Sequence, residues 1–139
     1  MDKRTRAREL AIQALYQLDI QGGDILPQLN EFFEDNEPNS KIRNLAEDWC
    51  IQTWENLQVC DEMIASVATR WDIGRLAMVD RSILRLAVYQ MRFCPDIPAK
   101  VVINEAIELA KKFSTGKSGR FVNGVLDAVL RNLRQEKVR

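Results

Sequence analysis

The chain has 139 residues, of which 46% are hydrophobic and 29% are charged. This length suits a single domain with its own core, and this composition excludes an intrinsically disordered protein. The apolar runs are too short to span a bilayer, and no apolar signal segment follows the first residues, so we expect a cytoplasmic protein without membrane contact.

The formal net charge is zero, but the charges are spread unevenly along the chain. Residues 1–18 carry four basic and two acidic side chains, residues 19–62 carry two and eleven, and residues 63–139 carry fourteen and seven. The net charges of these segments are therefore +2, −9 and +7. If the two basic segments meet in space, they form a positive surface of the kind that binds nucleic acid.

Helical periodicity runs through nearly the whole chain and predicts an all-α fold of seven helices. The first helix spans about residues 3–20 and ends at Gly22-Gly23. Asp24 is the expected N-cap of the second helix, and a polar loop follows at residues 35–39. Ser40 is the expected N-cap of the third helix.

The same pattern continues in the middle of the chain. A fourth helix follows a turn near Asn56 and includes Trp71, and Gly74 permits a bend into the fifth helix. The fifth helix ends near Phe93, and Cys94 to Pro98 connect it rigidly to the sixth helix.

The seventh helix follows a loop at residues 114–119 and buries a stripe centred on Val122, Val129 and Leu133. Gly124 costs roughly 1 kcal/mol in the interior of this helix, which predicts that another group approaches its backbone closely. Seven helices with short connections predict a bundle, folded as one unit or as two small packed units within a single domain over residues 1–139.

No residue of the sequence is a good candidate for catalysis or metal binding. The chain has no histidine, the commonest general base, and its three cysteines at positions 50, 60 and 94 suit buried free thiols in a reducing compartment. Gly116-Lys117-Ser118 matches the last three residues of a Walker A loop, but Lys111 occupies the position of the first glycine of that loop. A helix also precedes the segment, where a Walker A loop follows a strand. We therefore expect no enzyme, no cofactor and no metal.

A cluster of four cations within six residues opens the first helix: Lys3, Arg4, Arg6 and Arg8. Such a cluster, placed at the mobile start of a helix, suits phosphate contacts, which position a protein on nucleic acid without reading its sequence. A solvated basic turn without a ligand explains the cluster equally well.

The segment from Lys117 to Gly124 is a second basic element. Its glycines and Ser118 leave backbone N–H groups free at a helix N-terminus, where the helix dipole favours an anion. Phe121 projects about 110° from the apolar stripe, beside Lys117 and Arg120, as stacking on an unpaired base requires. The alternative is that Phe121 packs under the preceding loop.

The fifth helix carries Arg81, Arg85 and Arg92 along one polar stripe. Asp80 projects at the edge of its apolar face, where a carboxylate without a partner is costly. Asp80 therefore either pairs within the protein, which we favour, or awaits a partner protein.

Four blocks of the sequence resemble, in order, helices of the NusB family of bacterial transcription antitermination factors. They are RARELAIQALY at residues 6–16, VDRSILR and AVY within residues 79–89, the segment from Ile97-Pro98 through INEAIELAK at residues 103–111, and GRFVNGVLD at residues 119–127. The last block is quite specific, and residues 19–60 carry no motif of this kind.

The resemblance implies two small three-helix units and an adaptor function. With NusE, a ribosomal small-subunit protein, such factors bind single-stranded boxA RNA of nascent ribosomal RNA leaders and help RNA polymerase pass terminators. The family's RNA-binding positions fall here on Lys3, Arg4, Arg6, Arg8, Arg85, Lys117, Arg120 and Phe121. The NusE surface falls on the fourth and fifth helices, with Asp80 as the candidate. Thr5 and Ala7 interrupt the basic arm, which implies weak RNA binding without NusE.

Two other classes of protein remain open. Some RNA methyltransferases carry a NusB-like domain, although this chain ends before a cofactor-binding domain could begin. A helical protein–protein interaction module fits the bundle equally well, and a homodimer that buries the basic surface occurs in parts of the family.

Purified protein should hydrolyse neither ATP nor GTP above a buffer control, because the Walker A pattern is incomplete. Phosphate release is the measurement. Hydrolysis that disappears in Lys117→Ala would contradict this expectation.

Overall fold

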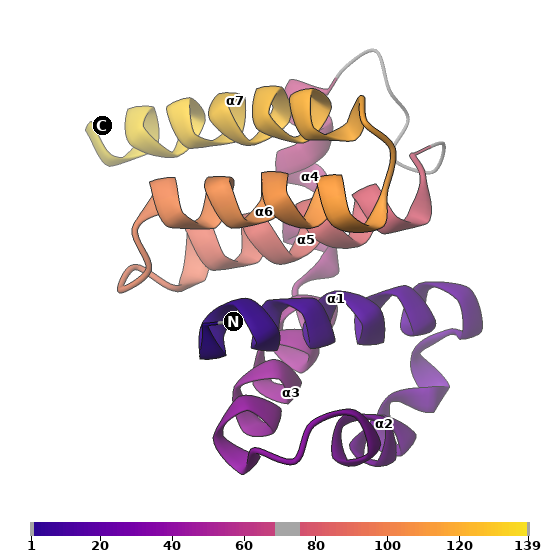
Figure 1. Cartoon of the computed structure of the whole chain (residues 1–139). Helices are drawn as coiled ribbons and strands as arrows, with labels where there is room; N and C mark the ends of the chain where they lie inside the picture. Colours follow the sequence, from indigo (N-terminus) through magenta and orange to yellow (C-terminus); the bar gives the residue numbers. More distant parts are fainter. Residues whose placement is uncertain (1, 69–75, 139) are drawn as a thin grey trace. The chain divides into compact units, whose positions relative to one another are not determined.

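The structure, a computed structural model, describes residues 2–68 and 76–138. Within these ranges the chain forms seven α-helices, one 3-10 helix and no strand, which confirms the all-α prediction (Figure 1). The chain divides into two compact units, Met1–Glu55 and Asn56–Arg139. The predicted positions of Trp71 and Gly74 lie outside the described residues.

The first unit contains three α-helices and the 3-10 helix: α1 (Lys3–Gln21), η1 (Gly23–Gln28), α2 (Leu29–Asn36) and α3 (Ser40–Glu55). Its core is formed by small and aliphatic residues of α1 together with aromatic residues of α2 and α3; they include Ala7, Leu10, Ala14, Leu18, Phe33 and Trp49. Gly22 ends α1 as predicted, with φ 92° and ψ 165°, a conformation almost confined to glycine.

Two predicted helix caps in this unit are wrong. Asp24 lies inside η1, and α2 begins only at Leu29. Pro27, which has no backbone N–H to donate, also lies within η1. Asn39 rather than Ser40 caps α3, because its side-chain Oδ1 accepts hydrogen bonds from the backbone N–H groups of the second and third helical residues, at 2.9 and 3.1 Å.

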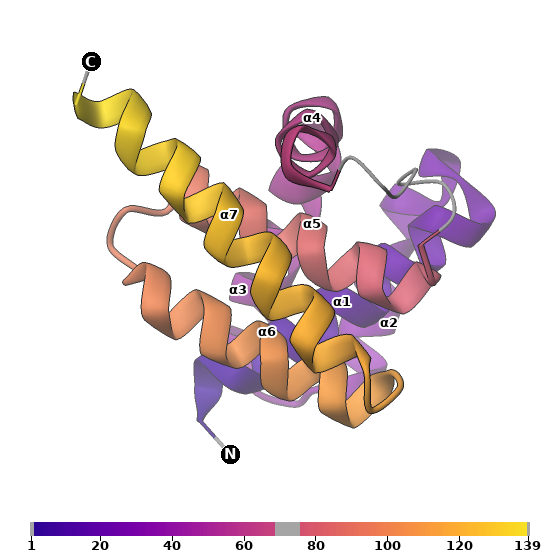
Figure 2. The same ribbon diagram turned by 90° about the horizontal axis from the view of Figure 1, so that it is seen from above.

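The second unit contains four α-helices rather than the three that the family resemblance implied: α4 (Leu57–Val67), α5 (Met78–Phe93), α6 (Ala99–Phe113) and α7 (Ser118–Val138). α5 contacts α4, α6 and α7, and α7 runs across α5 and α6 (Figure 2). Every residue from Ser82 to Gln90 is buried. The loop before α7 covers residues 114–117 only, because Ser118 and Gly119 already belong to the helix.

The apolar stripe of α7 is confirmed, but no group of the described chain makes the close approach that was predicted at Gly124. Val122, Val129 and Leu133 are buried, whereas Gly124 is exposed. A Cβ atom placed on Gly124 would meet no atom within 4 Å. Nothing within the described chain therefore requires glycine at this position.

The two glycines should respond oppositely to replacement by alanine. Gly22→Ala should lower the free energy of unfolding by about 1–3 kcal/mol, because alanine does not tolerate the positive φ. Gly124→Ala should raise it by up to about 1 kcal/mol, because alanine is the better helix former and the space is open. Urea denaturation measures both, and a destabilised Gly124→Ala would show a close contact at that helix position.

Candidate RNA and partner surfaces

The start of α1 presents two exposed cations, Lys3 and Arg4. Asp2 caps the helix, since its Oδ1 accepts a hydrogen bond from the backbone N–H of Arg4 at 2.8 Å. The cap fixes where the helix begins and leaves the side chain of Lys3 in solvent.

The other two cations of the predicted arm are engaged within the first unit. Arg6 donates hydrogen bonds to Glu9 and Glu37, both at 3.2 Å, and so ties α1 to the residue that follows α2. Arg8 is 2% exposed, and its guanidinium carbon lies 5.1 Å from the ring centroid of Trp49. The alternative of a solvated basic turn is therefore wrong for Arg8, because Arg8 lies on the face of α1 that packs against α3. RNA binding by Arg6 and Arg8 stays a prediction.

Arg85 is also engaged, although the sequence placed it on a polar stripe. Its Nε and Nη2 atoms each donate to a carboxylate oxygen of Asp61 on α4, both at 2.8 Å, which is the bidentate geometry of a strong ion pair. Arg85 is only 9% exposed although it lies on the predicted polar stripe, and its contact with RNA stays a prediction. Sequence reasoning missed Asp61, because its partner lies on another helix.

Asp80 is 8% exposed in the first turn of α5. Its Oδ2 accepts a hydrogen bond from the hydroxyl of Ser118 at 3.0 Å, whereas its Oδ1 has no hydrogen-bond partner within the described chain. The internal alternative for Asp80 is therefore confirmed for one oxygen, which pairs with a hydroxyl rather than with a cation, whereas the other oxygen is buried without a partner within the described chain. Contact of Asp80 with a partner protein stays a prediction.

Ser118 joins the start of α7 to this carboxylate. Since its single O–H is donated to Asp80, its oxygen accepts from the hydroxyls of Ser114 at 2.9 Å and Thr115 at 3.1 Å. Its backbone N–H donates to the carbonyl of Thr115 at 3.0 Å. The prediction that Ser118 offers a free N–H to an anion is therefore wrong.

A cavity of about 310 Å³ opens beside this hydrogen-bond network. Its lining consists of Leu76, Ala77, Asp80, Thr115, Lys117, Ser118 and Phe121. Three predicted site residues, Asp80, Lys117 and Phe121, therefore meet at one place. Lys117 and Arg120 are exposed, whereas Phe121 is half-buried. Both alternatives for the ring, stacking on a base and packing under the loop, therefore stay open.

The cysteines are poor candidates for chemistry. Cys50 and Cys60 are buried free thiols, and burial raises the pKa of each to about 12, so both are protonated at neutral pH. Among the described residues, no group of three or more acidic, cysteine or histidine side chains could hold a metal ion. No helix in the same ranges is long and apolar enough to cross a membrane.

The fold and these surfaces define a class: a small all-α protein whose exposed cations, half-buried ring and half-satisfied carboxylate suit binding. The chain belongs to the NusB family, whose sequence profile matches residues 5–131.

Individual members of the family match most of the chain. The transcription antitermination protein NusB of Anaeromyxobacter dehalogenans is 47% identical over 132 residues, which cover 94% of this chain and 92% of that protein. The solved structure of T. maritima NusB is 36% identical, with a TM-score of 0.84 and coverage of 94% and 92%. A structure of antitermination factors NusB and NusE in complex with dsRNA is 30% identical, with a TM-score of 0.81 and coverage of 95% and 98%.

Removing the hydroxyl of Ser118 should destabilise the second unit. Ser118→Ala leaves the buried carboxylate of Asp80 without its donor and should lower the free energy of unfolding by roughly 1–3 kcal/mol. Thr115→Ala is the matched control, because the exposed Thr115 hydroxyl reaches Ser118 and not Asp80, and it should stay within about 0.5 kcal/mol of the parent. Equal losses in the two variants would contradict the assignment.

Proposed function

We propose that this protein is a non-enzymatic adaptor in transcription antitermination that binds boxA-type single-stranded RNA together with NusE. The observation that carries the proposal is the cavity where a carboxylate with one unpaired oxygen, an exposed lysine and a half-buried aromatic ring meet. An anionic, a cationic and an aromatic group together suit the binding of a partner and RNA. None of them forms the pair of nucleophile and base that covalent catalysis requires. The relatives named for antitermination support the same function.

In this proposal the RNA contacts form two groups. Lys117 and Arg120 hold phosphates beside the half-buried Phe121, whose ring stacks on an unpaired base. Lys3 and Arg4 contact phosphates at the start of α1. Arg6 and Arg8 support RNA binding indirectly, because they hold α1, the helix that carries Lys3 and Arg4. Arg85 holds α5 against α4.

Asp80 contributes to the NusE surface in this proposal. A cation from NusE would approach the small exposed part of Asp80 and pair with the charge of its carboxylate, while Ser118 continues to satisfy Oδ2. Since the same cavity is lined by Lys117 and Phe121, a partner at Asp80 would contact the element that holds RNA. This arrangement supports RNA binding that is weak alone and stronger with NusE.

The whole chain acts as one RNA-binding domain in this proposal, in the cytoplasm, within the antitermination complex of RNA polymerase. The decisive experiment is a filter-binding titration of boxA RNA with and without NusE at fixed salt, with duplex RNA as competitor. Binding that NusE strengthens and duplex RNA does not displace supports the adaptor. NusE binding without RNA binding would indicate a protein interaction module, self-association that blocks RNA would indicate a homodimer, and methyl transfer would indicate an enzyme.

The salt dependence should report how many cations contact phosphate. With Lys3, Arg4, Lys117 and Arg120 as the contacts, log Kd for single-stranded RNA should change with log salt by a slope of about 3, against about 5 if the three engaged arginines also bound phosphate. Lys3→Ala/Arg4→Ala should lower the slope by about 1.4. An unchanged slope in that variant would remove the start of α1 from the RNA surface.

Phe121→Ala should weaken boxA binding by roughly 1–3 kcal/mol with little change in the salt slope, because stacking releases no counterions. Circular-dichroism melting checks the fold. A variant that melts at much lower temperature would show that Phe121 belongs to the core. A lower slope together with lower affinity would show that the ring positions Lys117 and Arg120 and stacks on no base.

Asp80→Asn should weaken NusE binding, because it removes the charge that a partner cation pairs with but keeps an oxygen for Ser118. The expected loss is about tenfold or more, as for a desolvated charge pair at an interface. Isothermal titration calorimetry measures it, with Asp127→Asn, an exposed carboxylate on α7, as the control. Unaltered NusE affinity with a large loss of stability would make Asp80 purely structural.

A further inference from the structure

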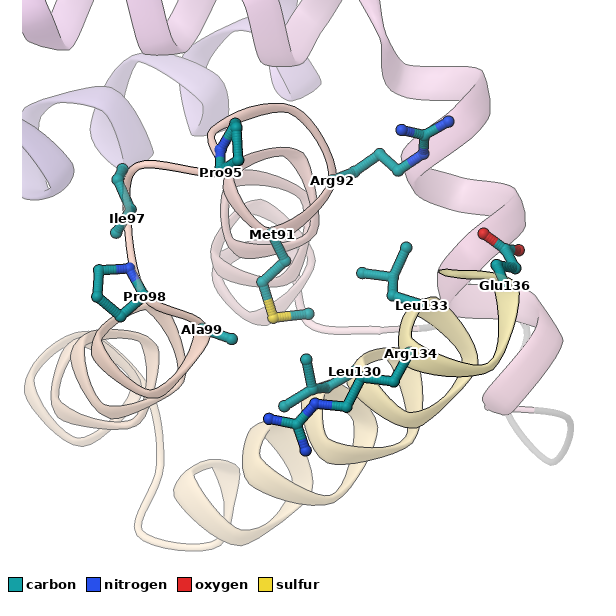
Figure 3. Close-up of a pocket in the computed structure, with 10 residues that line it drawn as sticks. All are labelled: Met91, Arg92, Pro95, Ile97, Pro98, Ala99, Leu130, Leu133, Arg134 and Glu136. Atoms are coloured by element: carbon teal, nitrogen blue, oxygen red, sulfur yellow. The ribbon is translucent and has the colours of Figure 1, made fainter. Parts of the chain in front are cut away.

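A second and larger cavity, of about 480 Å³, lies at the other end of the second unit (Figure 3). It is lined by the end of α5, the connection to α6, the first residue of α6 and the last turns of α7; the lining includes Met91, Arg92, Ala99, Leu130, Leu133 and Arg134. We call it the C-terminal groove. None of the predicted RNA or NusE residues lines it.

The floor of the C-terminal groove is apolar. Met91, Leu130 and Leu133 point into it in Figure 3, and two prolines of the connection, Pro95 and Pro98, form its wall. Leu133 is buried, whereas Met91 and Leu130 stay partly open to solvent. A volume of this size is within the range of pockets that hold small ligands, so it has room for aliphatic side chains of a partner.

The edge of the groove carries two exposed arginines. Arg92 and Arg134 lie on different sides of the floor in Figure 3, and Glu136 also lines the groove. None of the three forms an ion pair with another described residue. The edge is therefore net positive, in a unit whose residues 56–139 carry fourteen basic and nine acidic side chains.

The backbone around the groove is held in place before any ligand arrives. Two prolines fix φ in the connection, and the N–H of Ile97 donates to the carbonyl of Cys94 at 3.0 Å. The carbonyl of Pro98 accepts from the first turn of α6, at 3.0 and 3.2 Å. A preformed site lowers the entropic cost of binding.

We propose that the C-terminal groove binds an acidic, aliphatic segment of a partner protein. Leucine-like side chains fill the apolar floor, and flanking carboxylates pair with Arg92 and Arg134. RNA fits less well, because the lining contains no aromatic ring on which a base could stack and includes the carboxylate of Glu136. The proposal is independent of the RNA and NusE surfaces.

The probe is a short synthetic peptide with two leucines flanked by glutamates, compared with the same peptide carrying lysines in place of the glutamates. Amide chemical shifts of the protein should move saturably at residues 91–99 and 130–136 with the acidic peptide, less so at high salt, and not with the lysine peptide. Ala99→Phe, which fills the groove, should abolish the shifts.

Charge variants distinguish binding in the C-terminal groove from a general attraction of the acidic peptide to the basic second unit. Arg92→Glu/Arg134→Glu should weaken the acidic peptide by at least about tenfold. Lys100→Glu/Arg131→Glu changes the net charge equally at exposed positions outside the lining and should cost less than about twofold.

Four outcomes would overturn the proposal. They are the absence of saturable binding, equal binding of the lysine peptide, equal losses in the two double variants, and movement of the groove resonances by boxA RNA or by protein concentration while the acidic peptide leaves them unmoved. Melting temperatures of the charge variants close to that of the parent exclude misfolding as the cause of a loss.

Discussion

The second unit depends on the burial of α5. Every residue from Ser82 to Gln90 is buried, and three other helices contact α5, so a charged side chain on it is costly unless it finds a partner inside the protein. Arg85 finds Asp61 on α4, and Asp80 finds Ser118 at the start of α7. These two polar contacts determine which residues of α4 and α7 face α5. Apolar packing alone would specify this orientation of the helices less strictly.

The hydrogen bond to Ser118 also places the binding residues. Because Ser118 is the first residue of α7, holding its hydroxyl against Asp80 sets where that helix begins, and Lys117 and Phe121 line the same cavity from either side of it. Ser118 thus lies beside both Asp80, which we assign to a partner, and Phe121, which we assign to RNA. A ligand at either group acts on the same short segment of α7.

The sequence predicted most of the fold because helical periodicity is a local property of the chain. The bounds of α1 and the end of α5 match the expected positions, and the stripe through Val122 and Val129 is buried. The caps at Asp24 and Ser40 were misplaced because several neighbouring polar residues can cap a helix, and the backbone selects one of them. Lys117, Phe121 and Asp80 line one cavity, whereas the sequence assigned Asp80 to a separate surface from the other two, and their binding roles stay predictions.

What the sequence could not predict is which charges are already engaged. Arg4, Arg6, Arg8 and Arg85 have the same chemistry, yet Arg8 lies over Trp49 and Arg85 is paired with Asp61, a residue 24 positions away. Such contacts depend on how helices pack, and no motif marks them. Cations counted along a chain therefore overestimate the charge available to a polyanion. Arg92 and Arg134 show the opposite case, in which residues outside any motif provide available charge. Both lie exposed beside an apolar floor, where the groove selects a partner by its carboxylates and aliphatic side chains together.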